Sequence, residues 1–219
     1  MTRQPLNQKF RRTLADTGLI AILRGITSEQ VLAVGEVLYE AGFRLIEVPL
    51  NSPDPLVSVE CLASRLPDDV MVGAGTVMTA QQMRDVGSAG GQLIIMPHGD
   101  VEVVRASVAA GLIVVPGVAT PTEAFAALSA GASALKTFPA EMLSPAVIKA
   151  WCAVMPSTVP LLPVGGITLD GMQRYLVAGA SGFGLGGALY RPGDGAQLVA
   201  PRARAFMRRW SELKVVRSW

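Results

Sequence analysis

One lysine stands in an otherwise small and apolar stretch, "ALKTFPAE", where Lys136 follows Leu135 and precedes Thr137. An ordinary lysine pKa of about 10.4 leaves roughly one amine in 2,500 neutral at pH 7. Desolvation, or a nearby cation such as Arg24, would lower that pKa and free the amine to attack a ketone. The protonated imine that forms is an electron sink, so an adjacent C–H bond becomes acidic or an adjacent C–C bond breakable.

The elements that must position this lysine are read from the hydrophobic pattern. Short, continuously apolar runs alternate with segments of helical period, as expected for parallel strands buried on both faces. We expect strands at 19–24, 45–50, 70–76, 92–96, 113–116, 134–138, 161–164 and 182–185. We expect helices at 28–41, 55–65, 80–89, 101–110, 122–130, 145–155, 169–178 and 196–213, after a leading helix near 6–16. The cap residues expected before these helices are Thr27, Thr79, Asp100, Thr120, Ser144 and Thr168.

Eight strand–helix pairs with right-handed crossovers close into a (β/α)8 barrel, the TIM barrel. The 219 residues contain no linker or low-complexity segment, so residues 1–219 are predicted to form a single α/β domain with an extra N-terminal helix. The alternative, a doubly wound open sheet, needs only five or six such pairs.

In such a barrel, chemistry belongs to the carboxyl ends of the strands. Glu47 ends the second strand and Lys136 the sixth, and alternate strands contribute to one interior layer, so the two can meet over the barrel axis. Glu47 would then move protons as a general acid and base. A buried ion pair without a catalytic role is the alternative. The full set of strand ends is Arg24, Glu47, Thr76, Pro97–His98, Pro116–Gly117, Lys136, Gly165–Gly166 and Gly186–Gly187.

Glycines follow the last two strands, in "PVGGIT" and "GLGGAL". Loops in these places commonly cradle a phosphate with backbone N–H groups, which makes Gly165, Gly166, Gly186 and Gly187 candidate phosphate ligands. The second motif resembles a dinucleotide fingerprint, but that fingerprint belongs after the first strand of its unit. A Rossmann cofactor site is therefore not expected.

Further residues near the strand ends could contact a substrate. The hydroxyl of Thr76 could bind a carboxylate, and Asn51 and Ser52 offer polar groups in the second loop. Pro97 and His98 follow the fourth strand, where His98 either touches substrate or only begins a loop. Phe138 could form an apolar wall beside Lys136, with core packing as the alternative.

The composition narrows the classes of protein. Half of the residues (50%) are hydrophobic and 16% are charged, with a net charge of +2, which favours a well-cored protein and gives no reason to expect nucleic-acid binding. Cys61 and Cys152 lie in expected helices and suggest two buried thiols in a reducing compartment, without a disulfide or a zinc site. The apolar run 18–23 is too short for a signal or a membrane span, so a cytoplasmic location is expected.

The motifs "ILRG", "EVPLNSP", "VGAGTV", "PG", "LKTFPAE" and "PVGGIT" occur in this order through nearly the whole chain. In this combination the sequence resembles the class I aldolases that cleave 2-keto-3-deoxy-6-phospho sugar acids. The resemblance implies that Lys136 is the Schiff-base lysine and Glu47 the acid/base residue. It also implies that Arg24 and Thr76 bind the substrate, and that the four glycines surround its phosphate.

Two branches of that family compete. "EVPLNSP" and "LRGIT" resemble the 2-dehydro-3-deoxy-6-phosphogalactonate branch, whereas the gluconate-type enzymes typically carry "EVTLRT"; "FPAE" fits the gluconate branch equally. Two features depart from the galactonate pattern: "MPH" stands in place of a "TPN"-like tripeptide, and Gly187 in place of a serine beside the phosphate. The bulkier apolar residue often found at Thr137 in relatives is also missing, and the sequence gives no account of it.

The favoured branch implies cleavage of the phosphogalactonate to pyruvate and glyceraldehyde 3-phosphate in galactonate degradation, by a cytoplasmic homotrimer. It implies no metal and no cofactor, because the iminium polarises the substrate as a metal ion would. A gluconate or 4-hydroxy-2-oxoglutarate aldolase is the first alternative. A sugar-phosphate isomerase or epimerase, or a non-catalytic phosphate-binding barrel, is the more distant one.

Overall fold

The protein is described by a computed structural model that covers residues 3–216. The strands are β1 (Leu19–Ile22), β2 (Leu45–Pro49), β3 (Met71–Gly75), β4 (Leu93–Ile95), β5 (Ile113–Val115), β6 (Gly117–Val118), β7 (Leu135–Thr137), β8 (Leu161–Pro163) and β9 (Phe183–Leu185). The helices are α1 (Arg3–Thr17), α2 (Val31–Ala41), α3 (Pro55–Arg65), α4 (Ala80–Ser88), α5 (Val101–Ala109), α6 (Pro121–Ser129), α7 (Pro145–Cys152), α8 (Gly171–Val177) and α9 (Ala196–Val216).

All the expected strands and helices are confirmed, with ends that differ by a few residues. The strand expected at 113–116 is β5, which ends at Val115, and a further short strand that was not expected, β6, begins at Gly117. Pro116 stands between them and has no N–H group for a strand ladder. Its carbonyl still accepts a hydrogen bond of 2.9 Å from the backbone N–H of Lys136.

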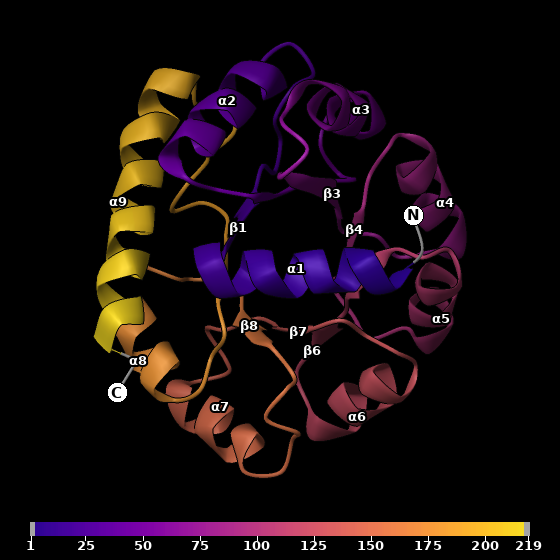
Figure 1. The fold of residues 1–219 in the computed structure, drawn as a ribbon, viewed down its shortest axis with the longest axis vertical. Helices are drawn as coiled ribbons and strands as arrows, with labels where there is room; N and C mark the ends of the chain where they lie inside the picture. The colour runs from indigo at the N-terminus through magenta and orange to yellow at the C-terminus, as the bar shows by residue number, and fades with distance from the viewer. Residues whose placement is uncertain (1–2, 217–219) are drawn as a thin grey trace.

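The strands form a curled parallel sheet in two parts. Six strands lie in the order β5-β4-β3-β2-β1-β9, and three in the order β6-β7-β8. Two contacts join the parts at the β8 and β9 side: the N–H of Ser181 donates to the carbonyl of Leu161 at 2.8 Å, and Val164 forms a parallel bridge with Gly184. Helices α2 to α9 surround the strands, and α1 lies across one end of them (Figure 1).

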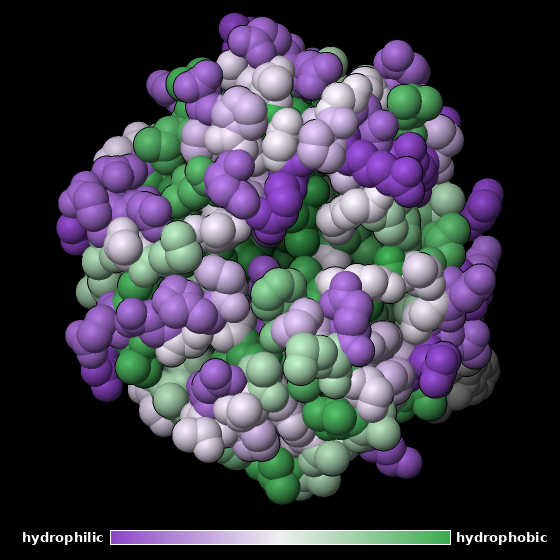
Figure 2. Space-filling model, turned by 180° about the vertical axis from the view of Figure 1, so that it is seen from behind, coloured by the Kyte–Doolittle hydropathy of each residue, from purple (hydrophilic) through white to green (hydrophobic). Residues whose placement is uncertain are grey.

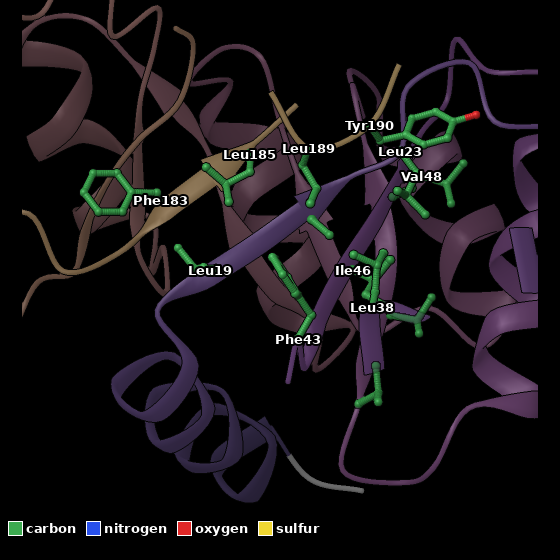
Figure 3. Packing of buried hydrophobic residues seen from close by; sticks show 14 of the residues in the cluster. Leu19, Leu23, Leu38, Phe43, Ile46, Val48, Phe183, Leu185, Leu189 and Tyr190 are labelled. Carbon is green, nitrogen blue, oxygen red and sulfur yellow. The ribbon is translucent and has the colours of Figure 1, made fainter. Parts of the chain in front are cut away.

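Side chains alternate along each strand between the inside of the curled sheet and the surrounding helices. Ile46 and Val48 belong to the layer between strands and helices, and Figure 3 shows Ile46 near Leu38 and Val48 near Leu23. Leu45 belongs to a second, inner cluster. Glu47 has the same parity as Leu45, so the inside of the sheet receives its carboxylate.

Helix α1 closes the amino ends of the strands. Its apolar side chains pack on the first residues of five strands, in a cluster that includes Leu6, Phe10, Leu14, Ile20, Leu45, Met71, Leu93 and Ile113. We call this apolar cluster under α1 the plug. Helix α9 holds it in place, because the indole N–H of Trp210 donates to the carbonyl of Asp16 at 3.0 Å. The Trp210 ring also fills the space beside Gly18, where a Cβ would lie 2.1 Å from it.

The predicted helix caps are confirmed in part. Thr79 and Thr120 form capping boxes with Gln82 and Glu123, and the Asp100 carboxylate accepts from two backbone N–H groups. Ser144 holds the N-cap position of α7 as expected, without a side-chain cap bond. Two expectations were wrong: α2 starts after Gln30 rather than after Thr27, and Asp170 holds the cap position of α8, although Gly171 N–H donates to Thr168 Oγ1.

The expectation of two buried thiols was wrong. Cys61 is half-buried in α3 and Cys152 is exposed at the end of α7, because the outer face of each helix faces solvent; both are free. Within residues 3–216, none of the helices is long and apolar enough to cross a membrane.

Candidate active site

Glu47 lies on β2 with only 1% of its surface exposed. In the parallel register it stands opposite Ile22 of β1 and Gly73 of β3. Its Oε2 atom is buried and has no hydrogen-bond partner among the described residues. A carboxyl oxygen in this state costs free energy, so its presence requires a reason other than stability.

Gly75, at the end of β3, leaves the space that the Glu47 carboxylate occupies. A Cβ built on Gly75 would lie 1.6 Å from Oε2 and 2.4 Å from Cδ of Glu47. The backbone of Gly75 is ordinary strand, whereas the next residue, Thr76, has a left-handed φ of 57°. The missing side chain at position 75, rather than any special backbone angle, is thus what admits the carboxylate.

Lys136 lies on β7 and is 5% exposed. Its Nζ atom stands 4.5 Å from the centre of the Phe138 ring. The Phe138 ring thus lies beside the lysine, where the expected apolar wall would stand. A ring face attracts the protonated amine weakly and offers it no hydrogen-bond acceptor, so much of the cost of burying the charge remains.

The pKa values of Glu47 and Lys136 are shifted by burial, by each other's charge and by the charge of Arg24. Burial raises the pKa of Glu47 to about 7, although the charges of Lys136 and Arg24 pull it down. Burial lowers the pKa of Lys136, as does Arg24, while Glu47 raises it. Both groups are thereby brought toward neutrality, where an amine can attack a carbonyl and a carboxyl can gain and lose a proton.

A cavity of about 430 Å³ opens beside Lys136 at the carboxyl ends of the strands. Figure 2 views this face, the one opposite α1, and shows a hollow near its centre. Predicted residues that line the cavity are Arg24, Lys136, Phe138, Gly165, Gly166, Gly186 and Gly187. The sequence thus placed residues from four separate loops and strands around one space.

Four predicted residues lie outside the lining of this cavity. Glu47 lies next to Gly75, and Thr76 comes directly after Gly75, where β3 has ended. Asn51 reaches the cavity through Arg24, because its Oδ1 accepts a hydrogen bond of 2.6 Å from Arg24 Nη1. Pro97 packs against Gly117, where a Cβ would lie 2.5 Å from the Pro97 carbonyl, and the adjoining His98 is exposed.

The loops after β1 and β2 are tied together. Besides the bond between Arg24 and Asn51, the backbone N–H of Gly25 donates to Ser52 Oγ at 2.9 Å. The guanidinium of Arg24 is therefore held at a fixed place by its neighbour loop, with donors left over for a ligand.

The glycine loops form the far side of the cavity. Gly165 and Gly166 both have left-handed backbone, with φ of 108° and 61°. A Cβ at Gly186 or Gly187 would meet nothing within 4 Å, so the loop after β9 borders open space. Backbone N–H groups in such loops suit an anion.

Sequence reasoning missed three residues here. Thr168 and Arg191 line the cavity. The carboxylate of Glu141 lies against Gly165, whose Cβ would be 2.2 Å from Oε2. The motif "LYRPG" after β9 was the available signal for Arg191, but a loop without periodicity does not reveal where its side chains point.

Within the described residues, His, Cys, Asp and Glu side chains form no group of three that could hold a metal ion. The chemical groups that line the cavity are an amine, guanidinium groups and backbone N–H donors, and the Glu47 carboxyl influences the amine electrostatically. These suit a substrate that carries a ketone and more than one anionic group.

The protein-family model described as KDPG and KHG aldolase matches residues 11–195 of this chain. The 2-dehydro-3-deoxy-6-phosphogalactonate aldolase of Escherichia coli (strain K12) is 43% identical over 194 residues, which is 89% of this chain and 95% of that protein. The KHG/KDPG aldolase of the same organism is 30% identical over 168 residues, or 76% of this chain and 77% of that protein.

Solved structures agree in fold. A native KDPGal structure superposes with a TM-score of 0.87 at 43% identity, covering 89% of this chain and 95% of the other. The KDPG aldolase of Legionella pneumophila, with pyruvate captured at low pH as a covalent carbinolamine intermediate, gives a TM-score of 0.77 at 28% identity. It covers 93% of this chain and 95% of that one.

Proposed function

Because the chain belongs to the KDPG and KHG aldolase family, and is therefore a carbon–carbon lyase, we propose that it cleaves 2-dehydro-3-deoxy-6-phosphogalactonate to pyruvate and D-glyceraldehyde 3-phosphate. The observation that carries the proposal is the buried amine of Lys136, beside the buried carboxyl of Glu47 and open to the cavity. The 43% identity to the E. coli phosphogalactonate enzyme, against 30% to the KHG/KDPG enzyme, favours the galactonate substrate.

In this mechanism the neutral amine of Lys136 attacks the C2 ketone of the substrate. Loss of water from the carbinolamine gives a protonated imine. The C3–C4 bond then breaks, its electron pair passes to the iminium to form an enamine, and the C4 hydroxyl becomes the aldehyde of glyceraldehyde 3-phosphate. The carbinolamine named for the Legionella enzyme is an intermediate of the same kind.

Glu47 moves the protons. Directly or through water, its carboxylate takes the proton from the C4 hydroxyl as C3–C4 breaks, and returns a proton to the enamine carbon before the imine is hydrolysed. A carboxyl with a pKa of about 7 is suited to both steps near neutral pH. Arg24, held by Asn51, and Thr76 are the proposed ligands of the substrate's carboxylate end, with Pro97 near it and Phe138 as the apolar wall.

The proposed phosphate site is the pair of glycine loops, with Gly165, Gly166, Gly186 and Gly187 as its ligands. We take β5 and β6 as one strand interrupted at Pro116, so that the curled sheet counts as a (β/α)8 barrel. The homotrimer usual in the family, a cytoplasmic location and a role in galactonate degradation belong to the same proposal.

Trapping tests the covalent step. Pyruvate with borohydride should reduce the imine and leave an adduct on Lys136, detectable by peptide mass. Lys136→Met should abolish both the adduct and cleavage, whereas Lys149→Met, which removes an exposed lysine from α7, should retain both. Cleavage that survives Lys136→Met would exclude the Schiff-base mechanism.

The substrate is tested by parallel assays with the two C4-epimeric phospho sugar acids. A higher kcat/KM for the phosphogalactonate supports the proposal. A higher value for the phosphogluconate would assign the chain to the alternative branch and keep the same chemistry.

A further inference from the structure

Arg191 follows β9 and lines the same cavity as Lys136. Its Nε–H donates to the carbonyl of Gly187 at 3.2 Å, which sets the guanidinium over the glycine loop. Its own backbone N–H donates to the Asp194 carboxylate at 3.0 Å, and Asp194 is in turn ion-paired with Arg202. These bonds fix the backbone and the side chain of Arg191, so its guanidinium is held at the rim of the cavity.

Three residues that line the cavity in the described chain have basic side chains: Arg24, Lys136 and Arg191. Arg24 is bonded to Asn51 in the loop after β2, and Lys136 is buried against Phe138. Arg191 instead belongs to the loop that contains Gly186 and Gly187. Arg191 therefore differs from Arg24 and Lys136 in the loop that carries it and in the groups that it contacts.

The loop after β9 offers an anion no side-chain donor at positions 186 and 187. A Cβ at either position would lie in open space, so the loop presents only backbone N–H groups there. Across the cavity, the carboxylate of Glu141 lies against Gly165 and Gly166 and adds negative charge beside the other half of the cradle. A dianionic phosphate at this place needs a cation, and a guanidinium can bind its oxygens with two parallel hydrogen bonds.

We infer that Arg191 binds the terminal phosphate of the substrate and sets the preference for phosphorylated over unphosphorylated sugar acids. In this arrangement Nε stays on the Gly187 carbonyl and the two Nη groups face the phosphate. Asp194 and Arg202 act as positioning residues. Asp194 binds the backbone N–H of Arg191, Arg202 binds Asp194, and of the three only Arg191 lines the cavity. The inference rests on the proposed aldolase function and names the residue that distinguishes its substrate class.

The test compares 2-dehydro-3-deoxy-6-phosphogalactonate with the same sugar acid lacking the phosphate. Arg191→Ala should lower the ratio of the two kcat/KM values by about 10- to 100-fold, as expected for loss of hydrogen bonds to a charged group. Most of the change should be in KM for the phosphorylated substrate. Arg105→Ala, which removes the same charge from the exposed face of α5, should leave the ratio unchanged.

A rescue separates phosphate binding from loop damage. Gly187 borders open space and has no left-handed φ, so Gly187→Ser adds a hydroxyl donor without strain. In the Arg191→Ala background, Gly187→Ser should recover part of the lost ratio. An unchanged ratio in Arg191→Ala, or an equal loss for both substrates, would overturn the inference.

The borohydride adduct with pyruvate keeps the two proposals distinguishable, because pyruvate carries no phosphate. If the wild-type protein forms no adduct on Lys136, the aldolase function fails. If the adduct forms and the Arg191→Ala ratio does not fall, only the inference about Arg191 fails.

Discussion

At the amino ends of the strands, α1 packs Leu6, Phe10 and Leu14 against the first residues of the sheet in an apolar plug. At the carboxyl ends of the same strands, the interior holds the carboxyl of Glu47 and the amine of Lys136, almost as deeply buried as the plug. The two ends are separated by only two or three residues of each strand, and both belong to the inside of the curled sheet.

The difference shows how one interior can serve opposite purposes. Burial of apolar surface stabilises the fold by about 25 cal/mol per Å². Burial of an ionisable group disfavours its charged form, and a buried oxygen without a partner lowers stability further. We conclude that the plug supplies stability, whereas the carboxyl ends give up stability to keep an amine and a carboxyl near neutrality.

The largest expected effect concerns the plug. Phe10→Ala removes a fully buried ring and should lower the free energy of unfolding by about 3–5 kcal/mol in urea denaturation. The folded fraction should cleave substrate at the wild-type rate, because Phe10 lies at the far end of the strands. Phe125→Ala, which removes a partly exposed ring from α6, is the control and should cost far less. A loss below about 1 kcal/mol would refute a stabilising plug.

The next effect concerns Glu47 and pH. The pKa of Glu47 is raised from 4.5 to about 7 in the folded protein. Between these values the folded state binds more proton than the unfolded state, so this group makes stability fall as pH rises. Glu47→Gln cannot ionise and should become more stable than wild type across this window, by about 3 kcal/mol above pH 7.

The measurement is urea denaturation of both proteins at a series of pH values. The difference in unfolding free energy should be flat below pH 4.5, grow between pH 4.5 and about 7, and be flat above. A difference independent of pH would contradict the burial of a titrating carboxyl at this position.

A third prediction concerns Gly75, whose missing side chain leaves room for the Glu47 carboxylate. Gly75→Ala puts a methyl group where the Glu47 carboxylate lies, so the carboxylate must move by about 1 Å or more and kcat should fall by about 100-fold. KM should change much less. Gly99→Ala, whose Cβ would make only ordinary contacts from 3.5 Å outward, is the matched control.

Shortening Glu47 to Asp tests whether the loss in Gly75→Ala comes from a clash with the carboxylate. In Gly75→Ala/Glu47→Asp the carboxylate ends one methylene earlier and leaves room for the methyl group. The double variant should therefore be more active than the product of the two single effects predicts. Independent, multiplying effects would show that Gly75 acts on the fold alone.

The smallest effect concerns Thr137, the neighbour of Lys136. It is fully buried, and its Oγ1 has no hydrogen-bond partner among the described residues. Thr137→Val keeps the shape and removes this hydroxyl, so it should raise the free energy of unfolding by about 1 kcal/mol. Ser107→Ala, which removes a buried hydroxyl that donates to the Val103 carbonyl at 2.7 Å, should give no such gain. Thermal unfolding of the two variants decides the point.

Sequence reasoning reached the positions of the strands and the burial of Glu47 and Lys136 on them because both depend on regular features. Continuous apolar runs mark buried parallel strands, and alternation along a strand determines which side chains share its inner face. The strand expected at 113–116 ended at Pro116, so β6 was missed. Two residues carry no periodicity, and β6 is defined only by its pairing with β7.

The missed features depend on contacts between segments far apart in the chain. The space that Gly75 leaves for Glu47 requires the exact neighbours of β2 and β3, and the bond from Arg24 to Asn51 joins two loops. Arg191 and Glu141 lie in irregular segments, where no period fixes the direction of a side chain. Such residues become visible only once the loops are placed.

The contact between the first and last segments has a consequence for synthesis on the ribosome. β1 lies between β2 and β9, and Trp210 of α9 fixes the junction of α1 and β1. The first strand to leave the ribosome therefore waits for one of its two neighbours until residue 185 is made, and for its clamp until residue 210. A chain stalled before that point exposes an unpaired strand edge, which makes it a substrate for chaperones.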